Sequence, residues 1–222
     1  MYHVVSISQK GSKSAVNEDA CLALTNKGIF VVADGVGGGP SGDFASRTLV
    51  EEVEQICTEG VNPEDDLLTA IQSANFKIYK AGQDPKLNGM ATTVVAVVLF
   101  EEDLLVCHVG DSRAYCFDGE NLKPLTKDHS KLVSKANDTQ KQVVTNALGV
   151  RESVKAEIQR FPHVGGEQIL LVTDGITDIV DEERMFQLLT SDNRSVSDKL
   201  KLLVEESELC GGRDDKTVLC VF

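Results

Sequence analysis

The sequence predicts an α+β fold in which helices cover the outer faces of antiparallel sheets. Segments that resemble strands come in local runs, and segments that resemble helices stand between those runs rather than after every strand. Two apolar segments, 91–100 and 103–109, are separated only by Glu101-Glu102, as in a hairpin. This order favours antiparallel sheets over a doubly wound parallel sheet. The 222 residues suit one domain, 1–222, with a sizeable core.

The predicted strands are rich in Val, Ile, Leu and Thr and are bounded by Gly, Asp or Asn. In chain order they are 3–8, 20–24, 28–33, 91–100, 103–109, 113–117, 168–173 and 216–222. Asp118-Gly119 predicts a tight turn after segment 113–117.

Apolar residues at helical spacing predict helices over 42–58 and 195–209. A third helix is predicted over 63–81, with Asn62 as the N-cap, Pro63 in the first turn and acidic residues behind it. A short helix is also expected near 181–190.

The composition excludes several classes of partner. A net charge of −13 argues against a nucleic-acid backbone, which is bound by clusters of Lys and Arg. No apolar run reaches the ~20 residues that span a bilayer, and the first ten residues lack the layout of a signal peptide. We therefore expect a cytoplasmic protein. There is no C-x-x-C pair, and the histidines show no metal-ligand spacing, so no soft-metal site is predicted; they are His3, His108, His129 and His163.

Acidic residues follow or precede glycine at the ends of predicted strands. They are Asp19, Asp34, Asp111, Asp174 and the pair Asp214-Asp215. One Asp-Gly alone is most often a turn, but so many placements beside apolar strands are hard to explain as turns. Carboxylates and carbonyls are the ligands that Mg²⁺ and Mn²⁺ prefer. Two such ions about 3.5–4 Å apart can activate a water for attack on phosphorus.

Two of these sites look alike. The segments 30–36 and 170–176 are both apolar strands that end in Asp-Gly. A buried strand fixes its last residue, and we expect each glycine to turn the backbone away with its carbonyl exposed.

The segment 37–42 formally matches the G-x-G-x-x-G pattern of dinucleotide-binding loops. Two observations disfavour that interpretation. The residue about 20 positions further on, near Glu59, lies at a helix end rather than at a strand tip. Asp34 would also place an anion beside the pyrophosphate.

The ordered motifs resemble the protein phosphatase 2C family (metal-dependent protein phosphatases) of the bacterial type, along nearly the whole chain. The matching segments are Asn17-Glu18-Asp19-Ala20, Val32-Ala33-Asp34-Gly35-Val36-Gly37-Gly38, Ala91-Thr92-Thr93, Val109-Gly110-Asp111-Ser112-Arg113-Ala114, Leu125-Thr126-Lys127-Asp128-His129-Ser130, Ala147-Leu148-Gly149, Leu171-Val172-Thr173-Asp174-Gly175 and Arg213-Asp214-Asp215-Lys216-Thr217-Val218.

The resemblance implies a four-layer α-β-β-α sandwich and a serine/threonine protein phosphatase. It implies hydrolysis of phosphoserine and phosphothreonine by direct attack of a metal-bridged water, with two or three Mn²⁺ or Mg²⁺ ions. Phosphorylated proteins would be the substrates, and a serine/threonine kinase would oppose the enzyme. The implied catalytic residues are Asp34, Asp174 and Asp214. The implied metal ligands are Asp34, the Gly35 carbonyl, Asp174 and Asp214, with Asp111 at a third ion and Glu18 and Asp19 acting through waters.

The chain departs from the family at three places. Ser14 stands where the family often has a phosphate-binding arginine, so Lys13 and Ser14 are the predicted substrate-binding residues. Gly39 stands where bacterial relatives usually have a histidine. The segment 131–146 is shorter than the family's flap, which predicts a more open cleft. His129 lies in one of the matching motifs, and we expect its role to be structural rather than catalytic.

Two other functions stay open at this point. Ser14 and Gly39 motivate a non-catalytic phosphoprotein-binding module on the same scaffold. The shortened flap motivates a phosphatase for small phosphorylated metabolites.

Overall fold

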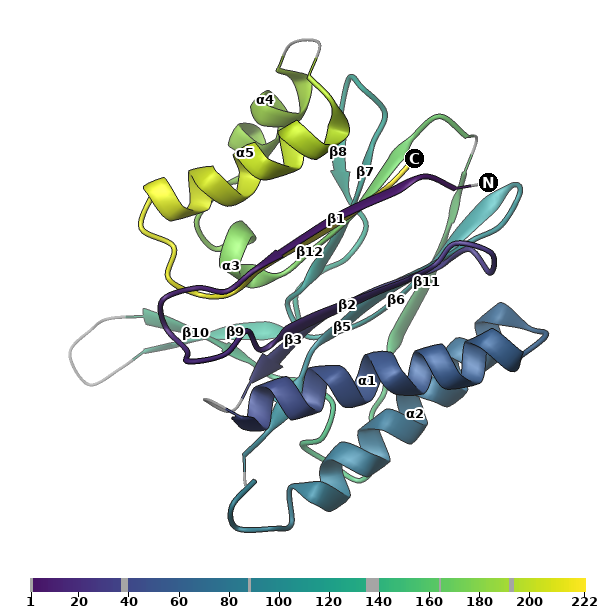
Figure 1. Ribbon diagram of the computed structural model, residues 1–222, viewed down its shortest axis with the longest axis vertical. Helices are drawn as coiled ribbons and strands as arrows, with labels where there is room; N and C mark the ends of the chain where they lie inside the picture. Colours follow the sequence, from purple (N-terminus) through teal and green to yellow (C-terminus); the bar gives the residue numbers. More distant parts are fainter. Residues whose placement is uncertain (1, 37–39, 88, 135–139, 164, 192–193) are drawn as a thin grey trace.

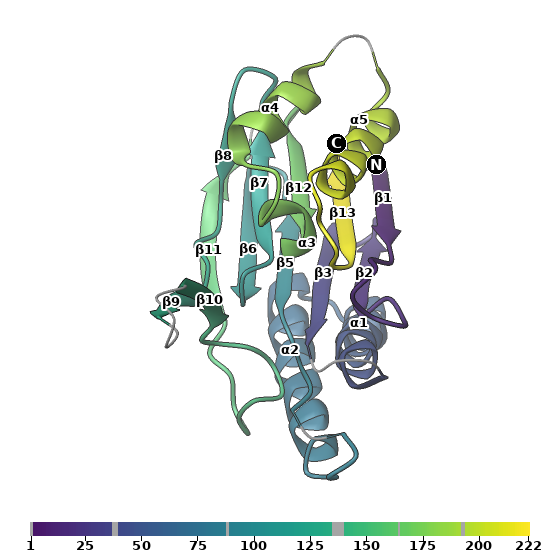
Figure 2. The same ribbon diagram turned by 90° about the vertical axis from the view of Figure 1, so that its left-hand side faces the viewer.

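Two antiparallel sheets pack face to face, and helices cover the outer face of each (Figures 1 and 2). The computed structural model describes all residues except 1, 37–39, 88, 135–139, 164 and 192–193. On one side lie α1 (Pro40–Glu59) and α2 (Pro63–Ala81). On the other lie α3 (Asp174–Thr177), α4 (Glu182–Thr190) and α5 (Val196–Leu209). The predicted four-layer α-β-β-α sandwich is confirmed.

The first sheet has the strand order β1-β13-β12-β7-β8 and the second has the order β11-β6-β5-β3-β2, with β4 paired to β3. The strands of the first sheet are β1 (Val4–Gln9), β7 (Arg113–Phe117), β8 (Leu122–Pro124), β12 (Gln168–Val172) and β13 (Lys216–Val221). Those of the second are β2 (Asp19–Leu24), β3 (Ile29–Val36), β4 (Ala91–Thr92), β5 (Val94–Leu99), β6 (Asp103–Val109) and β11 (Glu157–Pro162).

The apolar runs of β3 and β5 reflect burial on both faces. Val31 packs in the core under α1 and α2, while its neighbours Phe30 and Val32 pack between the two sheets. In the other sheet, Leu170 faces the core under α4 and α5, and Ile169 faces the core between the sheets. Because successive strand residues point to opposite faces, a strand buried on both sides must be apolar at every position.

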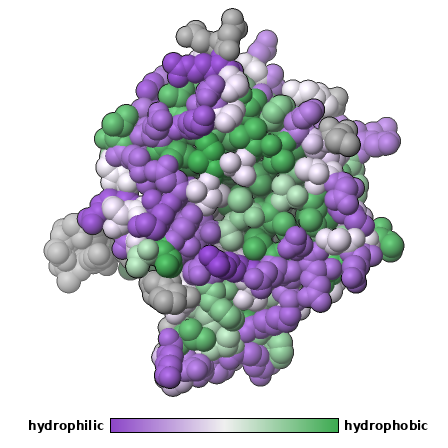
Figure 3. Space-filling view, in the orientation of Figure 1, coloured by the Kyte–Doolittle hydropathy of each residue, from purple (hydrophilic) through white to green (hydrophobic). Residues whose placement is uncertain are grey.

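The N- and C-terminal strands lie side by side. β1 pairs with β13 in antiparallel register, with Val4 opposite Val221. Figure 3 shows hydrophobic side chains gathered over the edge strands between the two helical layers, where Val4 and Cys21 pack against the core between the sheets. The pairing of β1 with β13 also brings the loops that precede β2 and β13 to the same end of the sandwich.

The predicted helices are confirmed, with one correction at a cap. Asn62 is the N-cap of α2, but its side chain makes no capping hydrogen bond. Its amide instead donates to Asp65 Oδ2 at 2.6 Å. The caps of α4 and α5 are conventional, because Asp181 and Ser195 accept hydrogen bonds from backbone N–H groups in the first turn. Within the described residues, none of the helices has both the length and the apolar composition to cross a bilayer.

Several strands depart from the sequence expectations. Segment 91–100 is not one strand: it divides into β4 and β5 at Thr93, whose hydroxyl accepts a hydrogen bond from Asp34 N at 3.0 Å. Strand β11 was not expected because its outward residues are mostly exposed and polar, as befits a sheet edge. The expected flap holds a two-stranded ribbon, β9 (Ser130–Ser134) and β10 (Gln140–Val144). Gly39 lies outside the described residues.

Candidate metal centre

The first two acids meet on neighbouring strands of one sheet. Asp19 begins β2 and stands directly opposite Asp34 in β3. The backbone carbonyl of Asp34 accepts hydrogen bonds from Thr93 N at 2.9 Å and from Thr92 Oγ1 at 3.0 Å. The backbone of Asp34 is therefore held on both sides, and its carboxylate remains available at the end of the strand.

A hydroxyl connects these acids to the other sheet. Thr173, the last residue before α3, donates from Oγ1 to Asp19 Oδ2 at 3.0 Å and accepts from Thr217 N at 2.9 Å. The carboxyl group of the next residue, Asp174, interacts with that of Asp34, since each is a cause of the other's pKa shift. Asp19 and Asp34 in one sheet and Asp174, just after β12 of the other sheet, thus converge at one end of the sandwich. We call these acids, together with Glu18 and Asp214 described next, the acid cluster.

Asp214 reaches the cluster from the loop before β13. The buried ammonium of Lys216 donates to the carbonyl of Asp214 at 2.9 Å. The carboxylate of Asp214 forms an ion pair with Lys13 at 2.5 Å. The loops also approach closely at Gly11, where a Cβ would meet the carbonyl oxygens of Arg213 and Asp214 at 2.3 Å. Glycine is required there because the backbones leave no room for a side chain.

Glu18 and the Gly35 carbonyl both lie close to Gly42. A Cβ at Gly42 would lie 2.5 Å from Glu18 Oε1 and 2.8 Å from the Gly35 oxygen. Ser14 Oγ donates to the other carboxylate oxygen of Glu18 at 3.0 Å. The predicted substrate-binding residue Ser14 therefore positions Glu18, whereas Lys13 extends to Asp214.

Asp111 follows β6 after a tight turn. Gly110 has φ +114°, and a Cβ there would meet the side chain of Thr93 at 2.6 Å. Burial, and next the charge of Asp174, raise the pKa of Asp111 to about 7. Asp111 is therefore within reach of the charge of Asp174, and its assignment to a third ion stays a prediction.

The carboxyl groups of the cluster are poorly stabilised as anions. Burial is the largest cause of the raised pKa of Asp19, to about 7, and of Asp174, to about 6, and nearby carboxylates add to it. Burial, followed by the charges of Asp19 and Asp174, raises the pKa of Asp34. Burial also raises the pKa of Glu18. Concentrated, mutually repelling carboxylates mark a site built for cations.

The residues fit bound divalent cations. Among the acids of the cluster, three buried carboxylate oxygens have no hydrogen-bond partner, namely Glu18 Oε1, Asp19 Oδ1 and Asp174 Oδ1. Buried polar atoms normally have partners, so these oxygens are consistent with ligation to metal directly or through water. A cavity of about 250 Å³ opens beside Asp174 and is lined by Lys13, Asp174, Gly175, Asp178, Ile179, Gly211, Gly212, Arg213 and Asp214.

Two residues beside the acids were not predicted from the sequence. Asp178, the C-cap of α3, lines the cavity, and its backbone N–H donates to the carbonyl of Asp174 at 2.8 Å. The i, i+4 spacing of these aspartates is the signal that could have revealed it. The other residue is Thr173, which precedes Asp174 in the second Asp-Gly segment. Nothing in its local sequence indicates that its hydroxyl reaches Asp19.

The expected likeness of the two Asp-Gly segments holds only in part. Gly35 remains in β3, opposite Thr92, and its carbonyl oxygen lies close to Gly42. Gly175 instead lies in the first turn of α3, and its carbonyl accepts a hydrogen bond from Ser207 at 2.7 Å. The expectation that the Gly175 carbonyl is exposed is wrong, because α5 packs against it.

Asp215 is a structural acid beside the cluster. Its side chain accepts from Gly11 N and from Glu18 N, both at 2.7 Å, and the residue is buried. It therefore ties the N-terminal loop and the start of β2 to the loop before β13.

We expect Asp215→Ala to lower the free energy of unfolding by about 3 kcal/mol, because two buried N–H groups lose a charged acceptor. Urea denaturation measures the effect. Asp118→Ala is the matched control: Asp118 also accepts from two backbone N–H groups, Glu120 and Asn121, but in an exposed turn. Asp118→Ala should lower the free energy of unfolding by less than about 1 kcal/mol, since water can take the place of the lost carboxylate as hydrogen-bond acceptor. An equal loss in the free energy of unfolding for the two variants would contradict this role of Asp215.

Comparisons with known proteins identify the family. The model of the protein phosphatase 2C family matches residues 9–202. The serine/threonine phosphatase stp of Listeria welshimeri is 34% identical over 230 residues, which cover 92% of this chain and 89% of the relative. PppA of Pseudomonas aeruginosa, described as a key regulatory component of T6SS, has a TM-score of 0.87 at 29% identity, covering 99% of this chain and 96% of its own. The serine/threonine phosphatase of S. agalactiae has a TM-score of 0.89 at 26% identity, covering 100% and 99%. On the family match and this degree of identity, the chain belongs to the protein phosphatase 2C family.

Proposed function

We propose that this chain hydrolyses phosphoserine and phosphothreonine in proteins, using Mn²⁺ or Mg²⁺ ions bound at the acid cluster. The observation that carries the proposal is the convergence of acids from both sheets, with raised pKa values and unpartnered oxygens, beside a cavity. Family membership supports the reaction class. A cytoplasmic setting and an opposing serine/threonine kinase belong to the same proposal.

The ions would be held by the residues that the sequence singled out. Asp34, the Gly35 carbonyl, Asp174 and Asp214 would hold the core pair, Asp111 a third ion, and Glu18 and Asp19 would act through waters. When bound, such ions supply Lewis-acid stabilisation of the phosphoryl oxygens and lower the pKa of water.

Side chains of the protein hold the acids in place and bring a positive charge to the site. Thr173 and Ser14 hold the carboxylates of Asp19 and Glu18 by hydrogen bonds at 3.0 Å each. These bonds fix the acids before substrate arrives, so little reorganisation is needed. Lys13 carries a cation to the cavity that the acids line. We assign to it the first contact with an incoming phosphate.

Lys13→Gln should raise the KM for a phosphopeptide about tenfold, while kcat changes less than about threefold. The reason is that one exposed charge contact contributes on the order of 1–2 kcal/mol to binding a phosphate. Steady-state kinetics measures both constants. Lys201→Gln is the control, because Lys201 pairs with Asp198 on α5, outside the residues that line the cavity. A fall in kcat at unchanged KM would contradict the assignment of Lys13 to substrate binding.

The proposed reaction is tested with phosphopeptides and sugar phosphates side by side, with Mn²⁺ and with EDTA. We expect turnover of phosphopeptides that requires the metal. Turnover confined to sugar phosphates would favour a metabolite phosphatase, and no turnover of either substrate at any metal concentration would favour a binding module.

A further inference from the structure

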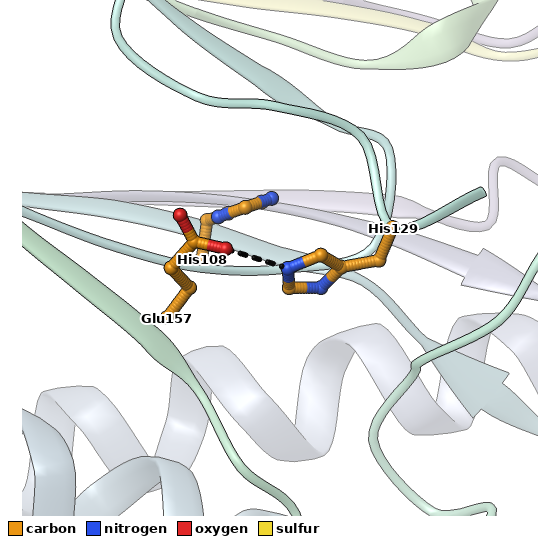
Figure 4. A group of neighbouring side chains, drawn as sticks. All are labelled: His108, His129 and Glu157. Carbon is orange, nitrogen blue, oxygen red and sulfur yellow. Dashed lines mark hydrogen bonds and ion pairs between the residues drawn. The ribbon is translucent and has the colours of Figure 1, made fainter.

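A second group of potential metal ligands lies outside the acid cluster. It consists of His108, His129 and Glu157, which we call the histidine cluster (Figure 4). One ligand atom from each lies within 4.8 Å of the other two. His108 is in β6 and Glu157 begins β11, and the two residues stand directly opposite each other in the antiparallel pairing. Directly opposed residues lie on the same face of a sheet, with Cβ atoms about 4.5–5.5 Å apart.

The third residue, His129, is fixed by its backbone. His129 N donates to the carbonyl of Gly110 at 2.8 Å, and Thr145 N donates to the carbonyl of His129 at 2.7 Å. Its ring packs on that of His108 with centroids 4.2 Å apart, and its Nε2 lies 3.1 Å from Glu157 Oε2. The side chain of His129 is 18% exposed and that of Glu157 is 41% exposed, so the cluster is open to solvent on one side.

The nitrogen His108 Nε2 is buried and has no hydrogen-bond partner. His108 is only 2% exposed. Burial, and next the neighbouring His129, lower the pKa of His108, which favours the neutral ring. A neutral imidazole with its proton on Nδ1 presents a lone pair at Nε2. An unpartnered buried lone pair is costly unless something binds it.

We propose that His108, His129 and Glu157 bind Zn²⁺, separately from the ions of the acid cluster. Two imidazole nitrogens and one carboxylate are a donor set that zinc accepts in proteins, with a fourth position for water. Mg²⁺ prefers oxygen ligands and would remain at the acid cluster.

Zinc binding here changes the tautomer of His129. In the metal-free protein His129 Nδ1 accepts a long hydrogen bond from Gly110 N at 3.3 Å, which assigns the ring proton to Nε2, facing Glu157. In the zinc-bound protein Nε2 gives its lone pair to the metal, the ring proton moves from Nε2 to Nδ1, and the hydrogen bond from Gly110 N is lost. The ring is neutral in both states, so no proton is released to solvent. Because Gly110 precedes Asp111, zinc would act on the loop that carries this acid.

Zinc binding is measured on the full chain by equilibrium dialysis against Zn²⁺ in excess Mg²⁺, with bound zinc determined by mass spectrometry. We expect the wild type to bind one more equivalent of zinc than His108→Gln or Glu157→Gln, with the affinity of that equivalent at least about 100-fold weaker in the variants. In histidine-labelled protein, zinc should shift the nitrogen resonance of His108 Nε2.

Two variants separate loss of the zinc site from misfolding and from zinc binding at other histidines. Glu157 is partly exposed, so Glu157→Gln is expected to fold even if His108→Gln does not. His163→Gln is the matched control, because His163 Nδ1 lies 2.8 Å from Glu167 Oε2 in a His–Glu pair that belongs to no such cluster among the described residues. This control should bind zinc as the wild type does. Equal zinc content in the wild type and Glu157→Gln, or an unshifted His108 resonance, would overturn the proposal.

Discussion

Replacing Asp34 with Asn is expected to lower turnover of a phosphopeptide by about 10³-fold, because a metal site contributes several kcal/mol to the transition state. Asp34 has Asp19 as its partner across β2 and β3, and the charges of Asp19 and of Asp174, at the start of α3, both act on its carboxyl group. Asn keeps the shape of the side chain but cannot donate a full negative charge to two ions.

The same substitution should stabilise the metal-free protein. Burial and the neighbouring carboxylates raise the pKa of Asp34, so its anion opposes folding when no cation is present. In EDTA the melting temperature of Asp34→Asn should exceed that of the wild type by roughly 2–4 °C for each 1 kcal/mol of repulsion removed. Asp118→Asn, in an exposed turn, is the control for both measurements. An active variant, or one less stable than the wild type in EDTA, would contradict the central role of Asp34.

The metal-free protein is expected to lose stability as the pH rises from about 4 to about 7. The folded protein holds the pKa of Asp19 at about 7 and of Asp174 at about 6, above the ordinary carboxyl value near 4. Across this window the folded state binds more protons than the unfolded state. The free energy of unfolding therefore falls with rising pH, by on the order of 5 kcal/mol or more for the two groups together.

Saturating Mn²⁺ should reverse this dependence, because metal displaces protons from the carboxylates and binds more tightly as they ionise. Urea denaturation at several pH values, in EDTA and in Mn²⁺, measures both curves. Asp19→Asn, which keeps an oxygen to accept from Thr173, should flatten the curve in EDTA. If stability in EDTA were constant or rose between pH 5 and 7, the raised pKa values of the cluster would be wrong.

Much of the sandwich could be predicted because its strands carry strong local signals. Strands buried on both faces, such as β3 and β5, are continuous apolar runs, and the Glu101-Glu102 hairpin joins neighbours in the sheet. Edge strands lack that signal. Glu157–Pro162 alternates weakly and is mostly exposed, since it needs only one neighbour, β6, to be a strand.

The sequence indicates which acids belong to the acid cluster, but not which hydrogen bonds hold them in place. Asp34 and Asp174 were visible as strand-end aspartates, and the family resemblance placed them together. The link from Thr173 to Asp19 and the support from Asp215 depend on how the two sheets are stacked. The histidine cluster was invisible for the same reason. His108 and His129 lack ligand spacing in sequence, and only the pairing of β6 with β11 and the bond to Gly110 bring them together.

The most direct test of the acid cluster is a crystal of the protein grown with Mn²⁺ and measured at wavelengths where manganese scatters anomalously. We predict two anomalous peaks about 3.5–4 Å apart between the carboxylates of Asp34 and Asp174, with Asp214 a ligand of one of them. Manganese bound only elsewhere, with no peak within ligand distance of Asp34, would contradict the assignment of these acids to a shared metal centre.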